Sequence, residues 1–179
     1  MVKAWDYQKE KLEERYSPTP GQLREIIKGI DNPRDQFYLC LTYLTGGRVG
    51  EVIDIKPTDI DITERNGIKV LVISMKNEKA KRFRQKMIPI RFDLEGDFIA
   101  LIMRYILNVK GTLFGFKTRQ RGWQIFRKYG LNPHFFRHLR ATHMVQYRGY
   151  KSHQMNQFFG WSDMRSSSKC VHLNWEDLI

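Results

Sequence analysis

The sequence predicts a mainly α-helical α+β domain with one small antiparallel β-hairpin. Most apolar residues recur at helical spacing, whereas the runs at 68–75 and 83–90 are β-branched or alternate between apolar and polar residues. With 179 residues and 41% hydrophobic content, the chain can bury one sizeable core. A single domain is therefore expected over residues 17–179, preceded by a charged linker or short helix at 1–16.

The first half of the domain is expected to begin with helices. Thr19 is a suitable N-cap and Pro20 suits the first helical position, so a helix starts there. A second helix, nearly all apolar, is expected at about 34–45 and is ended by two glycines. A third helix is expected to begin near Val49.

The second half is expected to hold the hairpin and four more helices. The two strand runs are separated by NEKAKR at 77–82, which predicts the turn. Helical spacing returns at 97–109 and at 118–129, and Pro133 opens a further helix. A shorter helix is expected in the segment SHQMNQFFG at 152–160.

The charge of the chain indicates a polyanionic partner. Lys and Arg number 31 against 19 acidic residues, so the net charge is +12, and nucleic acid is the usual partner of such proteins. A solvated basic surface is the alternative. An anionic membrane is a further alternative, but no apolar run approaches spanning length and no signal peptide is visible. Two cysteines define no disulfide framework, which fits a reducing cytoplasm.

Arg48 is the first candidate site residue. It follows two glycines, whose turn lets the backbone approach a ligand closely, and its guanidinium matches phosphate oxygens. Glu51, one helical turn further on, either orients that arginine from behind or is a solvated helix residue. Taken alone, Arg48 is more simply explained as a surface arginine near a helix start.

The segment HFFRHLRATH carries the second group of candidates. His134 and Arg137 are three residues apart and share a helix face, and Pro133 at the helix start leaves backbone amides near His134 for an anion. Arg140 adds a further cation. His134 and His138 have the spacing of a zinc helix, but HEXXH is absent and an arginine lies between them, so no metal site is expected. A basic helix with incidental histidines is the remaining alternative.

Three further features complete the candidate site. The turn between the strands concentrates cations, which either protect a solvated sheet edge or reach DNA and protonate a leaving oxygen. Trp161 is either a core residue or a neutral N–H donor to a phosphate. Cys170, nine residues later, is by itself an ordinary thiol. The cations of the turn and of the strand before it are Lys76, Lys79, Lys81 and Arg82.

Together these segments resemble the catalytic domain of the tyrosine recombinases, the phage-integrase and Xer family. The resemblance runs from about Thr19 to the C-terminus, and it rests on TGGRVGEV, ISMKNEKAKRFRQKMIPI, NPHFFRHLRATH and FFGWSDMRSSSKCVHLN in that order. It implies two catalytic arginines, Arg48 and Arg137, with Glu51 as the structural acid. It further implies catalytic roles for His134 and Trp161, and for one lysine among Lys76, Lys79 and Lys81, with Lys76 at the family's position. DNA contacts are expected from Lys79, Lys81, Arg82 and Arg140.

The family chemistry is DNA strand cleavage and rejoining without metal or cofactor. A tyrosine oxygen attacks a DNA phosphate, which forms a 3′-phosphotyrosyl link and frees a 5′-hydroxyl. The implied partners are double-stranded DNA and further copies of the chain, as a tetramer on DNA and a monomer in solution. The family acts in viruses and mobile elements, and a cytoplasmic, DNA-associated location is expected.

The sequence departs from the family pattern in two places. The position of the nucleophilic tyrosine is occupied by Cys170, and no tyrosine follows Tyr150. Residues 1–16 are also too short to be the family's separate N-terminal DNA-binding domain. A recombinase whose cleavage is impaired and a DNA-binding module on the same fold therefore both remain open, and a type IB topoisomerase shares the same site residues.

Overall fold

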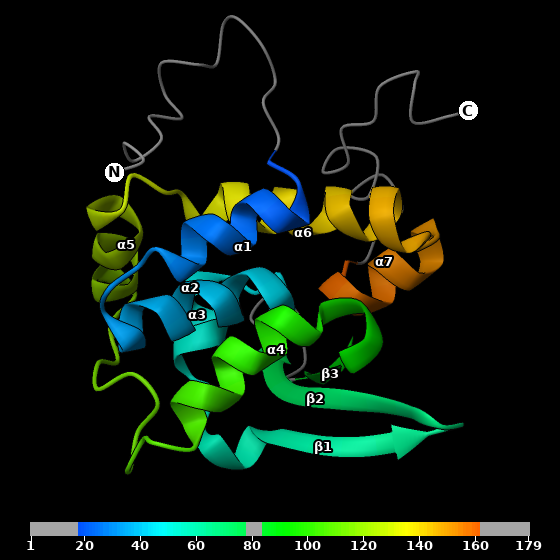
Figure 1. Cartoon of the computed structure of the whole chain (residues 1–179), viewed down its shortest axis with the longest axis horizontal. Coiled ribbons are helices and arrows are strands. Elements are labelled where there is room, and N and C mark those ends of the chain that lie inside the picture. Colours follow the sequence, from blue (N-terminus) through cyan, green and yellow to red (C-terminus); the bar gives the residue numbers. More distant parts are fainter. Residues whose placement is uncertain (1–17, 78–83, 162–179) are drawn as a thin grey trace, which may run out of the picture.

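The computed structural model describes residues 18–77 and 84–161, and in this part of the chain helices cover one face of a small sheet (Figure 1). Helix α4 lies next to the sheet, and α1 and α6 lie on the far side of the helical layer. The helices are α1 (Pro20–Lys28), α2 (Pro33–Thr45), α3 (Val49–Ile53), the 3₁₀ turn η2 (Pro57–Asp59), α4 (Phe92–Ile106), α5 (Arg119–Lys128), α6 (Pro133–Arg148) and α7 (Ser152–Phe159). The strands are β1 (Ile60–Arg65), β2 (Ile68–Asn77) and β3 (Arg84–Arg91).

The sheet has three antiparallel strands in the order β1-β2-β3, one more than the sequence analysis expected. The predicted pairing of the runs at 68–75 and 83–90 is confirmed, and their turn lies outside the described residues. The additional strand β1 is joined to β2 by Asn66 and Gly67, both with positive φ. An Asn-Gly pair of this kind is a strong hairpin signal, so the strand was detectable in the sequence.

The inner face of the sheet is apolar because side chains alternate along each strand. Leu71, Ile73 and Met75 of β2 are buried, as are Ile88 and Ile90 of β3. Helix α4 packs on both strands. This places β3 on one side of the core, with every second residue directed inward.

The first two helices begin and end as their sequences predict. The Thr19 hydroxyl accepts from the Gln22 amide at 3.2 Å, and the Gln22 side chain accepts from the Thr19 amide at 2.9 Å, so α1 starts with a capping box. Helix α2 ends at Gly46, whose left-handed backbone (φ 55°) suits glycine. The expectation that a Gly-Gly turn separates α2 from α3 is confirmed.

Among the later helices, α4 differs most from expectation, since it ends at Ile106 rather than at 109. Helix α4 begins at Phe92 rather than at 97, and Glu95 interrupts its regular backbone with φ −129° and ψ 20°. The helices expected at 118–129, from Pro133 and at 152–160 are found as α5, α6 and α7.

An aromatic cluster joins the helices at the centre of the domain. Tyr38 of α2 meets Phe114, Phe116 and Phe126 edge-on, at centroid distances of 5.3 to 5.7 Å. Phe126 in turn meets Phe136 of α6 at 5.1 Å. Edge-on contacts of this kind are favourable aromatic geometries, so α2, α5 and α6 share one core. Within the described residues, no helix is both long and apolar enough to span a membrane.

Candidate active site

Arg48 is the N-cap residue of α3 and is held by the carboxylate one turn further on. Its Nη1 donates to Oε1 of Glu51 at 2.9 Å, and its backbone N–H donates to Oε2 at 3.0 Å. The Arg48 side chain is 23% exposed, whereas that of Glu51 is fully buried. Glu51 is therefore not a solvated helix residue, and it orients Arg48 from inside the protein.

Lys86 of β3 contacts the same carboxylate, and the sequence analysis missed it. Its Nζ donates to Oε2 of Glu51 at 3.1 Å, and the residue is only 8% exposed. The signal was present, because Lys86 has the same strand parity as the buried Ile88 and Ile90. A lysine at an inward position of a strand needs a buried partner.

The electrostatics of Glu51 follow from these neighbours. Burial alone would raise the pKa of Glu51, but the charge of Lys86, followed by the bonds from Arg48, holds this pKa below its ordinary value. Burial lowers the pKa of Lys86, and the charge of Glu51 offsets part of that effect. The Glu51 carboxylate is thus kept ionised by the positive charges of Lys86 and Arg48.

Arg137 of α6 contacts the Gly-Gly turn that precedes Arg48. Its Nη1 donates to the Gly46 carbonyl, and its Nη2 donates to the Phe159 carbonyl at 3.2 Å. The guanidinium lies over the Phe159 ring, 4.8 Å from the centroid, and 5.7 Å from the ring centroid of Trp161. The residue is 8% exposed, so its position is fixed by α2, α6 and α7.

Trp161 packs in the same place. Its ring stacks on Phe159 with a centroid distance of 4.6 Å and an interplanar angle of 13°. It is partly exposed and borders the core. The tryptophan therefore lies beside Arg137, where the resemblance put a neutral donor.

His134 is exposed in the first turn of α6, three residues from the buried Arg137. Its ring meets Trp123 of α5 at a centroid distance of 5.5 Å. The expectation of open backbone amides near His134 is wrong, because Oδ1 of Asn132 accepts from the amides of His134 and Phe135 at 2.8 and 3.5 Å. The Asn132 side chain thus occupies the two amides that an anion would otherwise bind.

Lys76 lies near the end of β2 with a side chain that is 60% exposed. Its Nζ is 3.7 Å from Oδ2 of Asp54. Lys76, Asp54 and Glu51 line one hollow of about 110 Å³ together with Met75. Lys76 is thus close to the carboxylate that holds Arg48. Four predicted site residues, Lys79, Lys81, Arg82 and Cys170, lie outside the described residues.

The expected DNA contact of Arg140 is wrong in this structure. Arg140 is 3% exposed, and its Nη1 donates to Oε1 of Glu95 at 2.6 Å. Its guanidinium lies 5.2 Å from the Tyr43 ring centroid. Arg148 also reaches Oε1 of Glu95, at 3.3 Å. Arg140 therefore joins α6 to α4 inside the protein, since a buried arginine requires a buried carboxylate.

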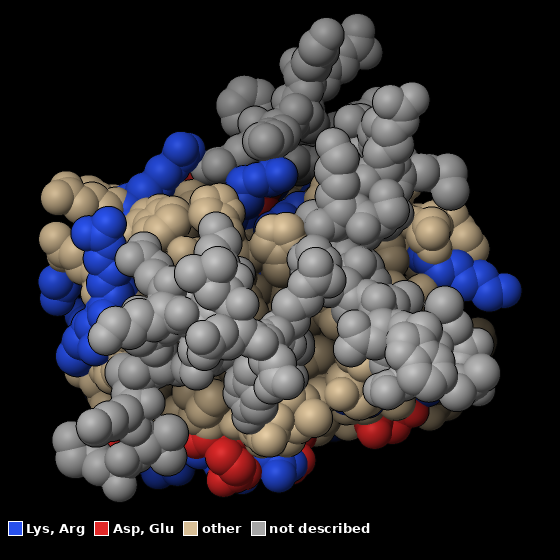
Figure 2. All heavy atoms as spheres, turned by 90° about the horizontal axis from the view of Figure 1, so that it is seen from above, with Lys and Arg blue, Asp and Glu red and all other residues tan. Residues whose placement is uncertain are grey.

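A basic surface on α5 was not singled out in the sequence. Lys and Arg side chains gather at the edge of the molecule where α5 lies (Figures 1 and 2). Its exposed cations are Arg119, Arg121, Arg127 and Lys128. Their spacing within one amphipathic helix was the available signal.

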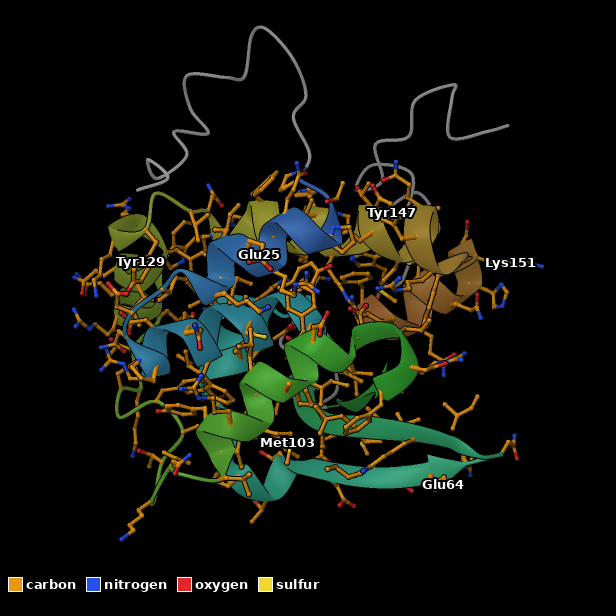
Figure 3. All side chains as sticks on the ribbon, viewed as in Figure 1. Glu25, Glu64, Met103, Tyr129, Tyr147 and Lys151 are labelled. Atoms are coloured by element: carbon orange, nitrogen blue, oxygen red, sulfur yellow. The ribbon has the colours of Figure 1, made fainter. Side chains whose placement is uncertain are left out.

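The buried carboxylate of Asp35 anchors this helix to α2. Asp35 is 1% exposed, and its Oδ2 accepts from Nζ of Lys128 at 3.1 Å and from the Tyr129 hydroxyl at 3.0 Å. Figure 3 labels Tyr129 at the end of α5. Gly122 completes the packing, because a Cβ there would lie 2.5 Å from the Tyr38 hydroxyl and 2.7 Å from Val49. Helix α5 is therefore seated directly on α3, which carries Arg48.

The structure thus brings Arg48, Glu51 and Lys76 together. It also places Trp161 beside Arg137, which bonds to the Gly46 carbonyl two residues before Arg48. His134 makes its ring contact with Trp123 of α5 rather than with these residues. A sequence model of the phage integrase family matches residues 19–176. The chain belongs to the phage integrase family. Among the described residues, no group of three or more His, Cys, Asp or Glu side chains is placed to hold a metal ion.

Curated members of this family are recognisably similar in sequence. Tyrosine recombinase XerC of Roseiflexus sp. (strain RS-1) is 28% identical over 176 residues, which cover 87% of this chain and 55% of the relative. Tyrosine recombinase XerA of Pyrococcus horikoshii is 27% identical over 168 residues, which cover 84% and 54%. The chain therefore spans about half the length of the curated relatives that it matches.

Solved structures of phage integrase family members share the fold. The crystal structure of XerA recombinase gives a TM-score of 0.69 at 19% identity, covering 91% of this chain and 62% of that one. XerH site-specific recombinase bound to its palindromic difH substrate, in a post-cleavage complex, gives 0.63 at 20% identity, covering 90% and 50%. The predicted fold class, a mainly helical recombinase catalytic domain with a small antiparallel sheet, is confirmed.

Proposed function

We propose that this chain is the catalytic domain of a site-specific DNA recombinase, in which Cys170 occupies the position of the nucleophilic tyrosine. The observation that carries the proposal is that Arg48 directly follows the Gly-Gly turn while Arg137 donates to the carbonyl of Gly46 in that turn, and that other groups of the protein also hold each guanidinium. Two arginines fixed in this way are suited to the non-bridging oxygens of one phosphate, where negative charge grows during phosphoryl transfer.

In the intact reaction, one P–O bond replaces another. A tyrosine hydroxyl attacks the phosphorus, loses its proton to His134, and forms the bond to the 3′-phosphate. The P–O5′ bond breaks, and a lysine, Lys76 in our assignment, gives its proton to the departing 5′ oxygen. Trp161 donates a neutral hydrogen bond to the phosphate. A 5′-hydroxyl of another strand then reverses these steps and joins the exchanged strands.

The partners follow from the same proposal. The exposed arginines of α5 form the main described surface for duplex DNA, and Lys79, Lys81 and Arg82 add contacts from the β2–β3 turn. Several XerH and Tn1549 integrase structures with this fold are described as complexes with DNA, which supports this assignment. We propose assembly of further copies on DNA, as a tetramer, and action in the cytoplasm.

The present chain is proposed to bind DNA but to cleave it poorly. A thiol at position 170 ends a full aromatic ring short of a tyrosine oxygen, and a ~1 Å misplacement can cost about 100-fold in rate. Cysteine is more readily ionised than tyrosine, with a reference pKa of about 8.5 against about 10. An ionised thiolate is nevertheless still too far from the phosphorus to replace the tyrosine oxygen.

A second candidate function is a DNA-binding module without cleavage, which Cys170 specifically favours. Covalent trapping on nicked suicide duplexes separates the two. Cys170→Tyr should form a protein–DNA adduct, whereas the parent and the control Cys170→Phe, which has the ring but no oxygen, should not. Absence of an adduct with Cys170→Tyr would leave the binding module as the function.

A further inference from the structure

Lys86 is a cation built into the inner face of the sheet. Its neighbours on that face of β3, Ile88 and Ile90, are buried members of the core. Only 7% of its side chain is exposed, compared with 60% for Lys76 on the neighbouring strand. A buried ammonium is unfavourable unless it is paired, so the contact that Lys86 makes decides its role.

That contact is shared with Arg48. Oε2 of Glu51 accepts both from Nζ of Lys86, at 3.1 Å, and from the backbone N–H of Arg48, at 3.0 Å. Oε1 of the same carboxylate accepts from Nη1 of Arg48 at 2.9 Å. One buried carboxylate therefore ties strand β3 to both the backbone and the guanidinium of Arg48.

We propose that Lys86 is a positioning residue that acts through Glu51 to fix the guanidinium of Arg48 for a DNA phosphate. The inference rests on the proposed function and deepens it, since it adds a residue to the machinery that orients the first arginine. Lys86 does not replace Lys76, Lys79 or Lys81 as the proton donor, because its ammonium is buried against Glu51.

Lys86 lies near the start of β3, so its ion pair with Glu51 also involves the β2–β3 strand pair. Strand β3 begins directly after residues 78–83, which include Lys79 and Lys81, and β2 ends with Lys76 and Asn77. Gln85, the neighbour of Lys86, is paired with Lys76 across the hairpin. The Lys86–Glu51 ion pair thus connects the strand pair that carries Lys76 to the helix whose N-cap is Arg48.

The charges around Glu51 support this reading. Lys86 reaches it from β3 and Arg48 from α3, while Arg137 of α6 adds a positive charge that is felt at Lys86. Burial would raise the pKa of Glu51, and the charge of Lys86 is the largest influence that lowers it. Without Lys86, the carboxylate loses the partner that most favours its ionised form.

The first test uses the chain as it is and needs no DNA. Carbon-13 NMR of labelled glutamate carboxyls follows the titration of Glu51 in the parent and in Lys86→Met. The control is Lys69→Met, which removes the same charge from β2, where Nζ of Lys69 lies 4.9 Å from the Phe92 ring centroid. Lys86→Met should raise the pKa of Glu51 and change the Arg48 amide resonance, and Lys69→Met should do neither. A Glu51 titration that is unchanged in Lys86→Met overturns the proposal.

The second test measures cleavage in the Cys170→Tyr background with nicked suicide duplexes. Lys86→Met should slow adduct formation by about 100-fold, as expected for a misplaced reacting group, and leave DNA affinity nearly unchanged. Lys86→Arg, which keeps the charge, should recover most of that loss. Adding Lys86→Met to Glu51→Gln should slow the reaction little further, because both act through one carboxylate.

The outcomes separate the two proposals. A cleavage rate in Lys86→Met equal to that of its parent, or fully additive losses with Glu51→Gln, would overturn the positioning role. If the Cys170→Tyr parent itself forms no adduct, the recombinase proposal fails. The NMR titration then still decides whether Lys86 lowers the pKa of Glu51 and affects the environment of Arg48. Lys86→Gln, which removes the charge but keeps a polar side chain, keeps the test decisive if the apolar variant does not fold.

Discussion

Gly46 and Phe159 lie so close together that a Cβ on the glycine would be 2.3 Å from Cε1 of the ring. The contact joins the end of α2 to the end of α7, residues that are far apart in the chain. The carbonyls of the same two residues accept hydrogen bonds from Arg137, and the Phe159 ring contacts both the Arg137 guanidinium and the Trp161 ring. The left-handed glycine is thus part of the support of the second arginine.

Gly46→Ala should be strongly destabilising. The left-handed backbone costs an alanine about 1–2 kcal/mol, and forcing the Phe159 ring to move adds about 1–3 kcal/mol. Gly149→Ala is the matched control, because Gly149 has φ 65° but nothing within 4 Å of its Cβ position. Urea unfolding should show a loss for the control of only about 1–2 kcal/mol. Equal losses of unfolding free energy for both variants would mean that the Phe159 ring can move aside without destabilising the fold.

Arg137 should matter for chemistry more than for binding. In the Cys170→Tyr background, Arg137→Ala should slow adduct formation by roughly 100- to 1,000-fold, because a positioned donor to developing charge is lost. Arg48→Ala should behave alike. Single-turnover rates at saturating protein measure the effect separately from affinity. A rate near the parental one would refute the clamp on the phosphate oxygens.

Much of this account was predictable, and the reasons for the gaps are physical. The caps at Thr19 and Gly46 and the alternation in β3 are local signals, so the element order followed from the sequence. The partner of a buried charge is not local. Arg140 was expected on DNA because nothing near it in the sequence indicates Glu95, 45 residues away, as its partner. The same holds for Lys86, whose strand parity marked it as inward but did not identify Glu51.

Duplex DNA binding should depend steeply on salt. If about six phosphates are contacted, log K should fall against log salt with a slope near −5. Arg127→Ala on α5 should make the slope smaller by about 1. Arg65→Ala is the charge-matched control, since β1 ends at the opposite side of the molecule from α5, next to Glu64 in Figure 3. Affinity that is constant between low and high salt would contradict binding through phosphates.

Stability should fall in mild acid because of His143. Its Nε2 lies 2.8 Å from the Pro18 carbonyl, which only accepts, so Nε2 carries the proton and Nδ1 accepts from the Tyr43 hydroxyl at 2.8 Å. Burial is the main reason that the pKa of His143 is lowered from 6.5 to about 4. The hydrogen bond to the Pro18 carbonyl and the charge of Glu95 raise this pKa and offset part of the effect, whereas the charges of Arg140 and Arg148 lower it further.

The sign follows from linkage. Above pH 6.5 His143 is neutral in both the folded and the unfolded states, so its contribution to the free energy of unfolding is fully present. As pH falls toward 4, the unfolded state takes up the proton first, so up to roughly 3 kcal/mol of unfolding free energy is lost. Urea unfolding from pH 7 to pH 5 should show about 2 kcal/mol of this loss. His143→Gln should be less stable at pH 7, but its free energy of unfolding should change less between pH 7 and pH 5. An equally steep profile in His143→Gln would assign the loss to other groups.

The most direct test of the central claim is the identity of the covalent bond formed by Cys170→Tyr. A randomised pool of nicked suicide duplexes should yield an adduct, and peptide mapping by mass spectrometry should find DNA attached through a 3′-phosphate at position 170, with a free 5′-hydroxyl on the released strand. The adduct should be absent when Arg48→Ala and Arg137→Ala are added. Attachment through a 5′-phosphate, attachment at another residue, or no adduct at all would contradict the account.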